Sequence, residues 1–386
     1  MGVLRGITWN HTRGYAPMAV TAQIFADRLP DVRIEWDRRS LWAFGEESLD
    51  ALVAAYDLLV IDHPMIGTAV QAGALLPLDE QLPPAVMARI REGAVGRSQE
   101  SYHYDGHDYA LAVDAACQVA VARPDLLDAA GEDVPTTWSA VVDLARRTRR
   151  VALPLNPIDV LSAFLTLCAH LGGPLRHEPD GLCRETGLDA LSMLRELAGL
   201  VDEPCRSANP IATLNRMVTT DEILYCPLLF GYTNYSREGY APRRLSFHDI
   251  PSIEGEGPRG SCLGGAGIAV SASSGQRDLA LAYAQWVSNA TTQRTEYVCA
   301  GGQPAAAAAW DDPLANALTG DFFRSTRATI DAAYLRPRHP SFPEFQTNAA
   351  HVLRDTLLGS VPPGAAIDHL DRGYRQTFES AATSPP

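Results

Sequence analysis

The chain of 386 residues contains no lysine, and all 32 of its basic residues are arginines. This absence excludes chemistry that needs a lysine amine, such as Schiff-base or pyridoxal-phosphate catalysis. It also excludes a P-loop, because that phosphate-binding motif requires a lysine. The sequence further lacks the G-x-S-x-G motif of many serine hydrolases and the H-E-x-x-H motif of zinc proteases. Several common catalytic signatures are therefore missing.

Positive charge is scarce overall, and long apolar runs are absent. The formal net charge is −14, which argues against nucleic acid and anionic membranes as partners, because binding to either needs a basic surface. No apolar run reaches the roughly 20 residues of a membrane span. Residues 1–5 also lack the basic and apolar regions of an export signal. The chain as written is therefore expected in the cytoplasm, and a chain whose leader was removed is expected in the periplasm or outside the cell.

The seven cysteines are scattered and form no C-x-x-C pair, and no Cys/His spacing suits a zinc site. His103 and His107 flank a turn near acidic residues, but a third fixed ligand is missing, so no metal is expected. A disulfide between Cys183 and Cys205 stays open, because spacing alone does not establish one.

The first hundred residues alternate between strands and helices. Strands are predicted at 4–9, 32–36 and 56–61, and helices at 17–29, 46–55 and 64–72. This alternation predicts a parallel sheet with right-handed crossovers. Ligands of such sheets lie beyond the carboxyl ends of the strands. Two of these ends carry polar side chains: Trp9, Asn10, His11 and Arg13 follow the first strand, and Asp62 and His63 follow the third.

The rest of the chain mixes strands and helices. Asp105-Gly106 predicts a tight hairpin turn, and the glycine- and proline-rich segment 252–265 is typical of an exposed linker or hinge. A break at 336–340 interrupts a helical C-terminal part. Further helices are predicted at 124–130, 138–147, 158–171, 188–201, 210–218 and 277–288. Further strands are predicted at 118–121, 151–155, 223–226, 245–250 and 266–271.

Three passages carry a resemblance to a known family. The first is Y-D-L-L-V-I-D at 56–62, which continues through G-A-L-L-P-L-D at 73–79. The second is Y-A-L-A-V-D at 109–114, followed by R-P-D-L-L at 123–127 and P-T-T-W at 135–138. The third is G-G-A-G-I-A-V at 264–270, followed by A-L-A-Y-A-Q-W at 280–286 and G-G-Q-P at 301–304. In this order they resemble extracellular solute-binding protein family 1, the sugar-binding class of bacterial ABC importers.

The resemblance implies an α/β chain with the two-lobed, type II fold of periplasmic binding proteins. Strands would cross between the lobes near Val113 and Gly264, and a small molecule would be clamped in the cleft between them. Lobe 1 would comprise residues 1–112 and 264–310, and lobe 2 residues 113–263 and 311–386. The family implies no cofactor and no catalysis, and it implies an ABC permease as partner. The chain is expected to be a monomer without membrane insertion.

The candidate ligand-binding residues combine hydrogen-bonding groups with flat aromatic faces, which suits sugars, and arginines, which suit carboxylates. They are Trp9, Asn10, His11, Arg13, Asp62, His63, Asp114, Phe230, Tyr232, Asn234, Tyr235, Gly265, Gln303 and Arg336. Most also have a structural interpretation. The alternatives are a core position for Trp9, a solvated surface for His11 and Arg13, a helix cap for Asp62, a turn for Asp114, ring packing for Tyr232 and Tyr235, a conformational role for Gly265, and a surface ion pair for Arg336.

Three functions compete at this point. The first is a binding protein that delivers a sugar, a sugar acid or a related carboxylate to an ABC importer. The second is a cytoplasmic enzyme on the same scaffold, since some relatives of this fold, such as the thiaminases, are enzymes. In that case His11 or His63 would act with Asp62 or Asp114 as acid and base, and Cys117 would be the nearest nucleophile unless it is buried and inert. The third is a cytoplasmic sensor that passes closure on to a partner.

Overall fold

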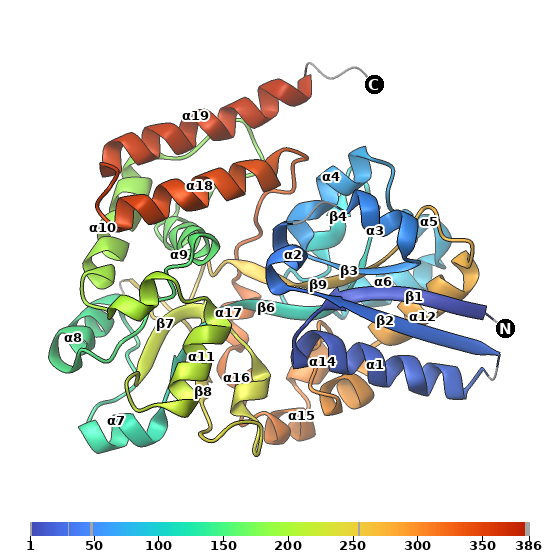
Figure 1. Cartoon of the computed structure of the whole chain (residues 1–386), viewed down its shortest axis with the longest axis horizontal. Coiled ribbons are helices and arrows are strands. Elements are labelled where there is room, and N and C mark those ends of the chain that lie inside the picture. The colour runs from blue at the N-terminus through green and yellow to red at the C-terminus, as the bar shows by residue number, and fades with distance from the viewer. Residues whose placement is uncertain (1, 30, 47–48, 254, 383–386) are drawn as a thin grey trace. The chain divides into compact units, whose positions relative to one another are not determined.

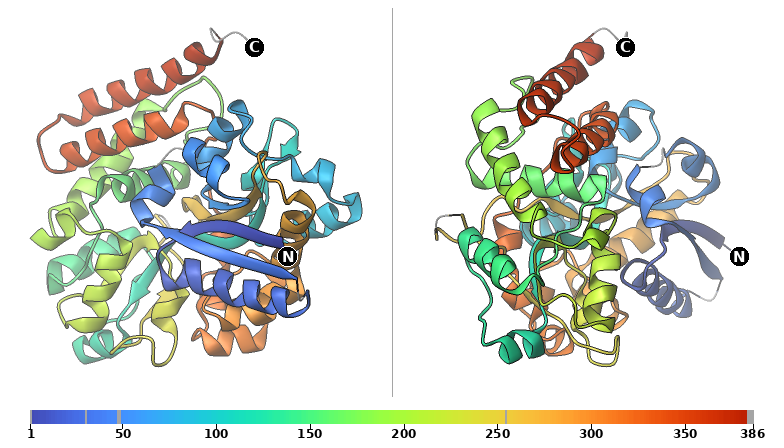
Figure 2. Two further views of the ribbon diagram at one scale, coloured as in Figure 1. Left: turned by 45° about the vertical axis from the view of Figure 1, so that its right-hand side comes forward. Right: turned by 60° about the vertical axis from the view of Figure 1, so that its left-hand side comes forward.

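The computed structural model describes residues 2–29, 31–46, 49–253 and 255–382 (Figures 1 and 2). Residues 47–48 of the predicted helix at 46–55 and Glu254 of the predicted linker lie outside the described residues. The chain groups into two compact units. Unit 1 comprises Met1–Ala116, Gly264–Leu318 and Arg338–Pro340, and unit 2 comprises Cys117–Leu263, Thr319–Pro337 and Ser341–Pro386. The predicted lobe boundaries at 112/113, 263/264 and 310/311 stay a prediction.

Unit 1 is built on a sheet whose first strands are parallel. Strand β1 (Gly2–Trp9) pairs in parallel with β2 (Val32–Arg39) and with β3 (Leu58–Ile61), as the alternating sequence predicted. Strand β9 (Leu263–Val270) is antiparallel to β3. β3 is buried throughout, which explains its continuous apolar sequence. Figure 1 shows β1, β2 and β3 together, with α1 (Thr12–Asp27) along them.

Helices and short elements complete unit 1. Buried residues of α1 and α12 (Arg277–Ser288) meet between the helices, where the Thr21 Oγ1 and Tyr283 hydroxyl lie 2.9 Å apart. The hairpin predicted at Asp105-Gly106 joins β4 (His103–Tyr104) to β5 (His107–Asp108). The remaining elements are α2 (Leu41–Glu46), α3 (Asp50–Ala55), η1 (His63–Met65), α4 (Ile66–Gln71), α5 (Leu78–Gln81), α6 (Pro84–Glu92), η2 (Glu100–Tyr102), α13 (Ala290–Thr292), the π-helical turn η5 (Gln293–Tyr297), α14 (Ala307–Trp310) and α15 (Pro313–Leu318).

Unit 2 has a smaller antiparallel sheet covered by helices. Strand β6 (Leu111–Ala122) begins in unit 1 and pairs in unit 2 with β7 (Tyr225–Phe230) and β8 (Ser246–His248). Helix α9 (Pro157–His170) is buried along most of its length, and α18 (Phe342–Leu357) packs against it and against α19 (Pro363–Ala382) (Figure 2). The other elements are α7 (Pro124–Ala130), α8 (Trp138–Thr148), α10 (Arg184–Ala198), η3 (Glu203–Arg206), α11 (Pro210–Thr219), η4 (Thr233–Ser236), α16 (Phe322–Ser325) and α17 (Arg327–Asp331).

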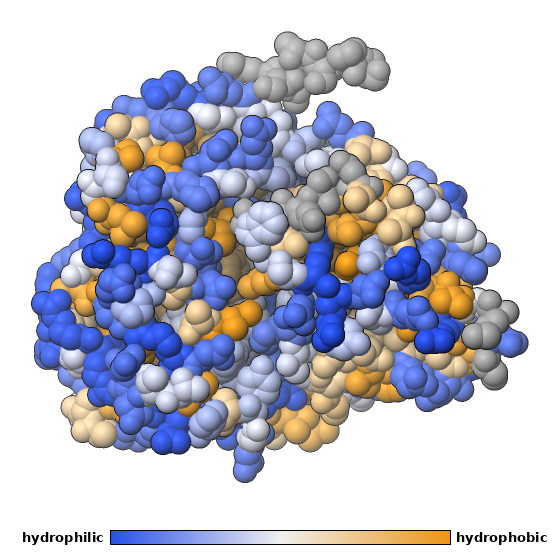
Figure 3. All heavy atoms as spheres, in the orientation of Figure 1, coloured by the Kyte–Doolittle hydropathy of each residue, from blue (hydrophilic) through white to orange (hydrophobic). Residues whose placement is uncertain are grey.

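Many of the apolar residues gather in cores inside the units. The face shown in Figure 3 is mostly hydrophilic, with apolar residues in small groups. Unit 1 has a core that includes Leu4, Leu58 and Ile268, and unit 2 has its own core, which includes Phe164, Leu194 and Leu353. Among the described residues, no helix is long and apolar enough to cross a membrane.

Candidate functional site

The predicted ligand-binding residues divide between the two units. Unit 1 contributes residues from the ends of β1 and β3, from β6 and β9, and from the loop before α14. They are Trp9, Asn10, His11, Arg13, Asp62, His63, Asp114, Gly265 and Gln303. Unit 2 contributes residues that follow β7 and α17, namely Phe230, Tyr232, Asn234, Tyr235 and Arg336.

In unit 1 the central feature is a buried ion pair between Arg13 and Asp114. The Arg13 Nε donates to Asp114 Oδ2 at 2.8 Å, and Nη2 donates to Oδ1. The side chains are only 5 % and 0 % exposed. Arg13 is therefore not a solvated surface residue, and Asp114 lies inside β6 rather than in a turn. Burial raises the pKa of the Asp114 carboxyl above its usual value, although the Arg13 guanidinium opposes the shift.

The backbone around Asp114 is held from three sides. Gly265 in β9 has φ +115°, and a Cβ there would lie 2.3 Å from the Asp114 carbonyl oxygen, so its role is at least partly conformational. The Gln303 amide donates to the Ala115 carbonyl at 2.8 Å. Gln293, which the sequence interpretation missed, donates to the carbonyls of Ala112 and Val113 at 3.3 and 3.2 Å. No local pattern marks Gln293, because its partners lie about 180 residues away.

The end of β1 turns directly into α1 through His11. The His11 Nδ1 accepts a hydrogen bond from the Arg13 backbone N–H at 3.0 Å and so caps the helix. Burial, followed by the nearby Arg13 charge, lowers the pKa of His11 to about 4. The imidazole is therefore neutral at pH 7. Trp9 is buried and packs on Phe44 with the ring centroids 4.9 Å apart, whereas Asn10 is exposed at the strand end.

Asp62 and His63 follow β3 as predicted. The Asp62 carboxylate accepts the His63 backbone N–H at 2.8 Å and caps η1, so the helix-cap interpretation is confirmed. Its Oδ1 also lies 3.2 Å from the Nδ1 of the buried His63 imidazole. The Asp62 charge reaches Asp114 strongly enough to raise its pKa. The carboxylates that follow β3 and lie in β6 therefore share one electrostatic environment within unit 1.

In unit 2 the aromatic cluster at the end of β7 packs against other residues of the same unit. Tyr232, Asn234 and Tyr235 are buried, and Phe230 is half-buried at the strand end. The Tyr235 hydroxyl donates to the Asn215 side-chain oxygen at 2.8 Å. The Tyr235 and Tyr240 rings pack edge to face, with their centroids 5.2 Å apart. Ring packing therefore accounts for part of what Tyr235 does, which the sequence left open.

Arg336 occupies a different setting from the one expected. It is buried, and its Nη1 donates to the Gln346 side chain at 3.0 Å. The alternative of a surface ion pair does not fit this position, because Arg336 is buried within unit 2.

The geometry gives little support for a catalytic site or a metal site. Cys117 is 2 % exposed inside β6, where burial disfavours a reactive thiolate. Within the described residues, no group of three or more His, Cys, Asp or Glu side chains could hold a metal ion. Cys183 and Cys205, both described, are free thiols; the Cys205 thiol instead donates to Asp202 at 3.0 Å.

Comparisons with known proteins identify a matching family and several solved structures with a similar fold. The family model described as bacterial extracellular solute-binding protein matches residues 46–319. An ABC transporter solute-binding protein of Agrobacterium radiobacter K84, solved with ribitol, is 18 % identical and has a TM-score of 0.81, over 98 % of this chain and 99 % of that chain. Maltose-bound MalE3 of T. maritima is 16 % identical and has a TM-score of 0.84, over 97 % and 100 %.

A third similar structure is the ABC transporter solute-binding protein of Agrobacterium vitis S4 with bound D-mannitol. It is 15 % identical and has a TM-score of 0.77, over 99 % of each chain. At such identities the similarity concerns the fold. The predicted α/β fold of the two-lobed periplasmic sugar-binding proteins is thereby confirmed.

Proposed function

The chain belongs to the bacterial extracellular solute-binding protein family, and from this premise we propose that it binds a sugar or polyol as the substrate-binding component of an ABC importer. The observation that carries the proposal is the family match over 46–319 together with a fold shared with carbohydrate-binding proteins. The similar proteins from A. radiobacter and A. vitis hold ribitol and D-mannitol. The ligand class follows by analogy with them.

The Arg13–Asp114 pair argues for a neutral ligand over a sugar acid. The guanidinium is bonded through two nitrogens to a carboxylate of its own unit, so its charge is largely neutralised before any ligand arrives. An arginine that clamps a carboxylate ligand would have to give up this partner. Sugars and polyols instead need hydroxyl acceptors and donors, which Asn10 and Asp62 in unit 1 and Asn234 in unit 2 would supply.

The aromatic residues complete the proposed ligand contacts. Phe230 and Tyr232 would offer flat apolar faces from unit 2, and Trp9 would offer one from unit 1. His11, His63, Tyr235, Gly265, Gln303 and Arg336 would then act mainly by fixing the loops that carry the contacts. The predicted lobes, with boundaries near 112/113 and 263/264, would contribute these two groups of residues to one ligand.

Delivery to an importer implies a partner and a place. The partner would be an ABC permease, and the chain would work outside the cytoplasm, as the description of its family as extracellular indicates. It would act as a monomer. As the resemblance implies, the proposed function needs no cofactor.

The first test is ligand binding by the full chain. Because a ligand that binds only the folded form stabilises it by about 2.7 kcal/mol at a hundred times its Kd, ribitol, D-mannitol, maltose or another neutral sugar should raise the melting temperature. Glucuronate and other sugar acids should give no shift. Asn10→Ala should weaken the binding measured by calorimetry, because it removes an amide that would hydrogen-bond to the ligand. Asn10 is exposed at the end of β1, so its loss leaves the core intact.

Arg33→Gln, on the exposed face of β2, is the matched control and should bind normally. Shifts confined to sugar acids would contradict the neutral ligand, and a full carbohydrate panel without any shift would contradict the proposed function.

A further inference from the structure

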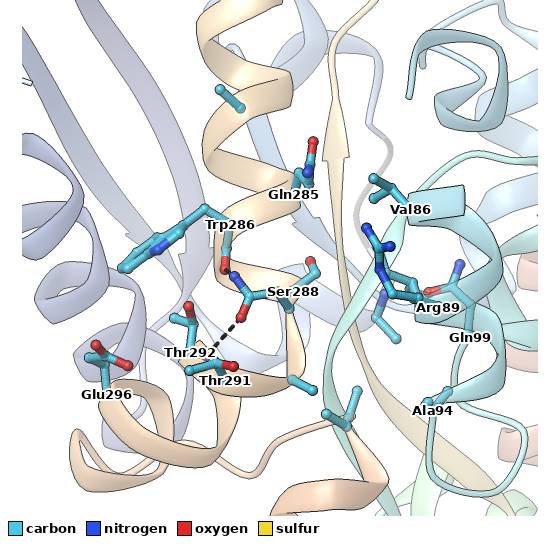
Figure 4. A pocket seen from close by; sticks show the side chains of 18 of the residues that line it. Val86, Arg89, Ala94, Gln99, Gln285, Trp286, Ser288, Thr291, Thr292 and Glu296 are labelled. Carbon is cyan, nitrogen blue, oxygen red and sulfur yellow. Dashed lines mark hydrogen bonds between the residues drawn. The ribbon is translucent and has the colours of Figure 1, made fainter. Parts of the chain in front are cut away.

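A pocket of about 790 Å³ lies in unit 1, and none of the predicted ligand-binding residues lines it. It is formed by α6, the last turns of α12 and the residues that follow α12 (Figure 4). Its size falls within the range of small-molecule sites, roughly 300–1,000 Å³. We refer to it as the α6–α12 pocket.

One buried hydroxyl in this pocket lacks a hydrogen-bond partner. Ser288, the last residue of α12, lines the pocket and is 6 % exposed. Its Oγ is buried and has no partner among the described residues. A helical serine commonly bonds back to the carbonyl four residues earlier, and a buried hydroxyl without a hydrogen-bond partner is destabilising. The hydroxyl is therefore available for a group that enters the pocket.

One cation on the opposite wall also lacks a partner. Arg89 on α6 is exposed and has no ion pair or side-chain hydrogen bond with any described residue. Its neighbours differ in this respect, because Arg91 bonds to Asp108 at 3.0 Å and Arg97 bonds to Glu100 at 2.7 Å. Figure 4 shows Arg89 and Val86 on one side of the pocket and Gln285 and Ser288 on the other.

Apart from Gln285, the other charged and amide groups in the lining are already engaged with described residues. Glu296 faces Arg28 at 3.9 Å, at the end of the pocket near Trp286 (Figure 4). Gln99 donates to Asp108 and to the Ala110 carbonyl. The Asn289 side chain bonds to the Trp286 carbonyl at 2.7 Å and to the Thr292 N–H at 2.9 Å. Most of the remaining lining is apolar: Val86, Ile90, Ala94, Ala112, Ala282, Ala290, Ala305 and Ala306.

From this chemistry we propose that the α6–α12 pocket is a second ligand site, and that it takes a small amphiphilic carboxylate. The carboxylate would pair with Arg89 and accept the Ser288 hydroxyl, and the apolar body would lie against Val86 and Ile90. An anion is favoured because the one acid of the lining is offset by Arg28, which leaves the Arg89 charge uncompensated. The site is separate from the one proposed for sugars.

The test uses 4-phenylbutyrate as the probe and 4-phenylbutanol as its neutral counterpart. Calorimetry on the full chain should show binding of 4-phenylbutyrate, and Arg89→Gln should weaken it about tenfold, as expected for a hydrogen bond to a charged group. The same substitution should leave the weaker binding of 4-phenylbutanol unchanged. Ala282→Phe, which adds a ring at an exposed helix position on the pocket rim, should abolish the binding of both.

Two controls separate this site from the carbohydrate site. Arg33→Gln should bind 4-phenylbutyrate normally, and both pocket variants should keep the melting-temperature shift given by the neutral sugar or polyol. Absence of 4-phenylbutyrate binding, or binding that Arg89→Gln and Ala282→Phe leave unaltered, would overturn the proposal without touching the carbohydrate function. If the parent chain binds 4-phenylbutyrate but shows no melting-temperature shift with neutral sugars or polyols, the result would instead count against the carbohydrate function.

Discussion

Arg13 and Asp114 show how a polar pair can be held in the interior of unit 1. Moving either charge out of water costs several kcal/mol, and only good geometry and further hydrogen bonds offset this cost. The pair meets this condition through its two parallel hydrogen bonds. The sequence supplied each residue as a candidate but could not supply the pair, because the two positions are 101 residues apart.

Breaking the pair from one side should be costly. Arg13→Met leaves the Asp114 carboxyl buried without its counter-charge, and we expect a loss of about 3–5 kcal/mol in the free energy of unfolding. The double variant Arg13→Met/Asp114→Leu replaces both charges by apolar groups and should recover most of that loss. Urea denaturation of the three proteins, followed by circular dichroism, measures these differences. A double variant no more stable than Arg13→Met would contradict the interpretation.

At the scale of elements, helix α1 starts earlier than its sequence predicted. The amphipathic pattern predicted a helix at 17–29, whereas the helix begins at Thr12 and contains Pro17. The residue that fixes this start is His11, whose imidazole caps the helix. Histidine is not one of the usual N-capping residues, so the pattern around His11 is only a weak signal for a helix start.

The His11 cap should make unit 1 sensitive to acid. Its pKa is about 4 in the folded chain, against 6.5 for the ordinary imidazole, so the unfolded chain binds more protons between these values. Stability contributed by the neutral cap is therefore present above pH 6.5 and is lost as the pH falls toward 4. His11→Asn retains a capping side chain without the titration. We expect its melting temperature to fall less than that of the parent chain between pH 6.5 and 4, and an equal fall would exclude His11 as the source.

Sequence patterns found most elements and failed where tertiary context decided. Helices α7 and α12 have the predicted bounds, and α8 begins at Trp138 as predicted, where Thr137 caps it. The strand predicted at 151–155 is wrong: only Val151 forms a bridge, with Tyr225, and Pro154 cannot donate to a ladder. Strand β6 is longer than predicted because it continues through Asp114. A charged residue at this position predicts the end of a strand, and only its buried arginine partner explains why the strand continues.

At the scale of the whole molecule, the chain builds two hydrophobic cores from segments that alternate along the sequence. Unit 1 combines three segments, and so does unit 2. The family resemblance anticipated two halves because the family that it indicates has two lobes, not because composition changes along the chain. The pattern of apolar residues alone could not assign the C-terminal helices to one half, since α15 belongs to unit 1 and α16 to unit 2.

Two separate cores should lose protection separately. Ile268 in β9 is fully buried in the core of unit 1, and Leu194 in α10 is fully buried in the core of unit 2. Truncating either to alanine costs about 2–5 kcal/mol, and this cost falls first on the cooperative region that contains the residue. Ile268→Ala should therefore raise amide hydrogen exchange in β1, β3 and α12 while α9 and α18 stay protected, and Leu194→Ala should do the reverse. Mass spectrometry of peptides from both variants distinguishes this outcome from equal loss throughout, which would mean that the two cores unfold as one.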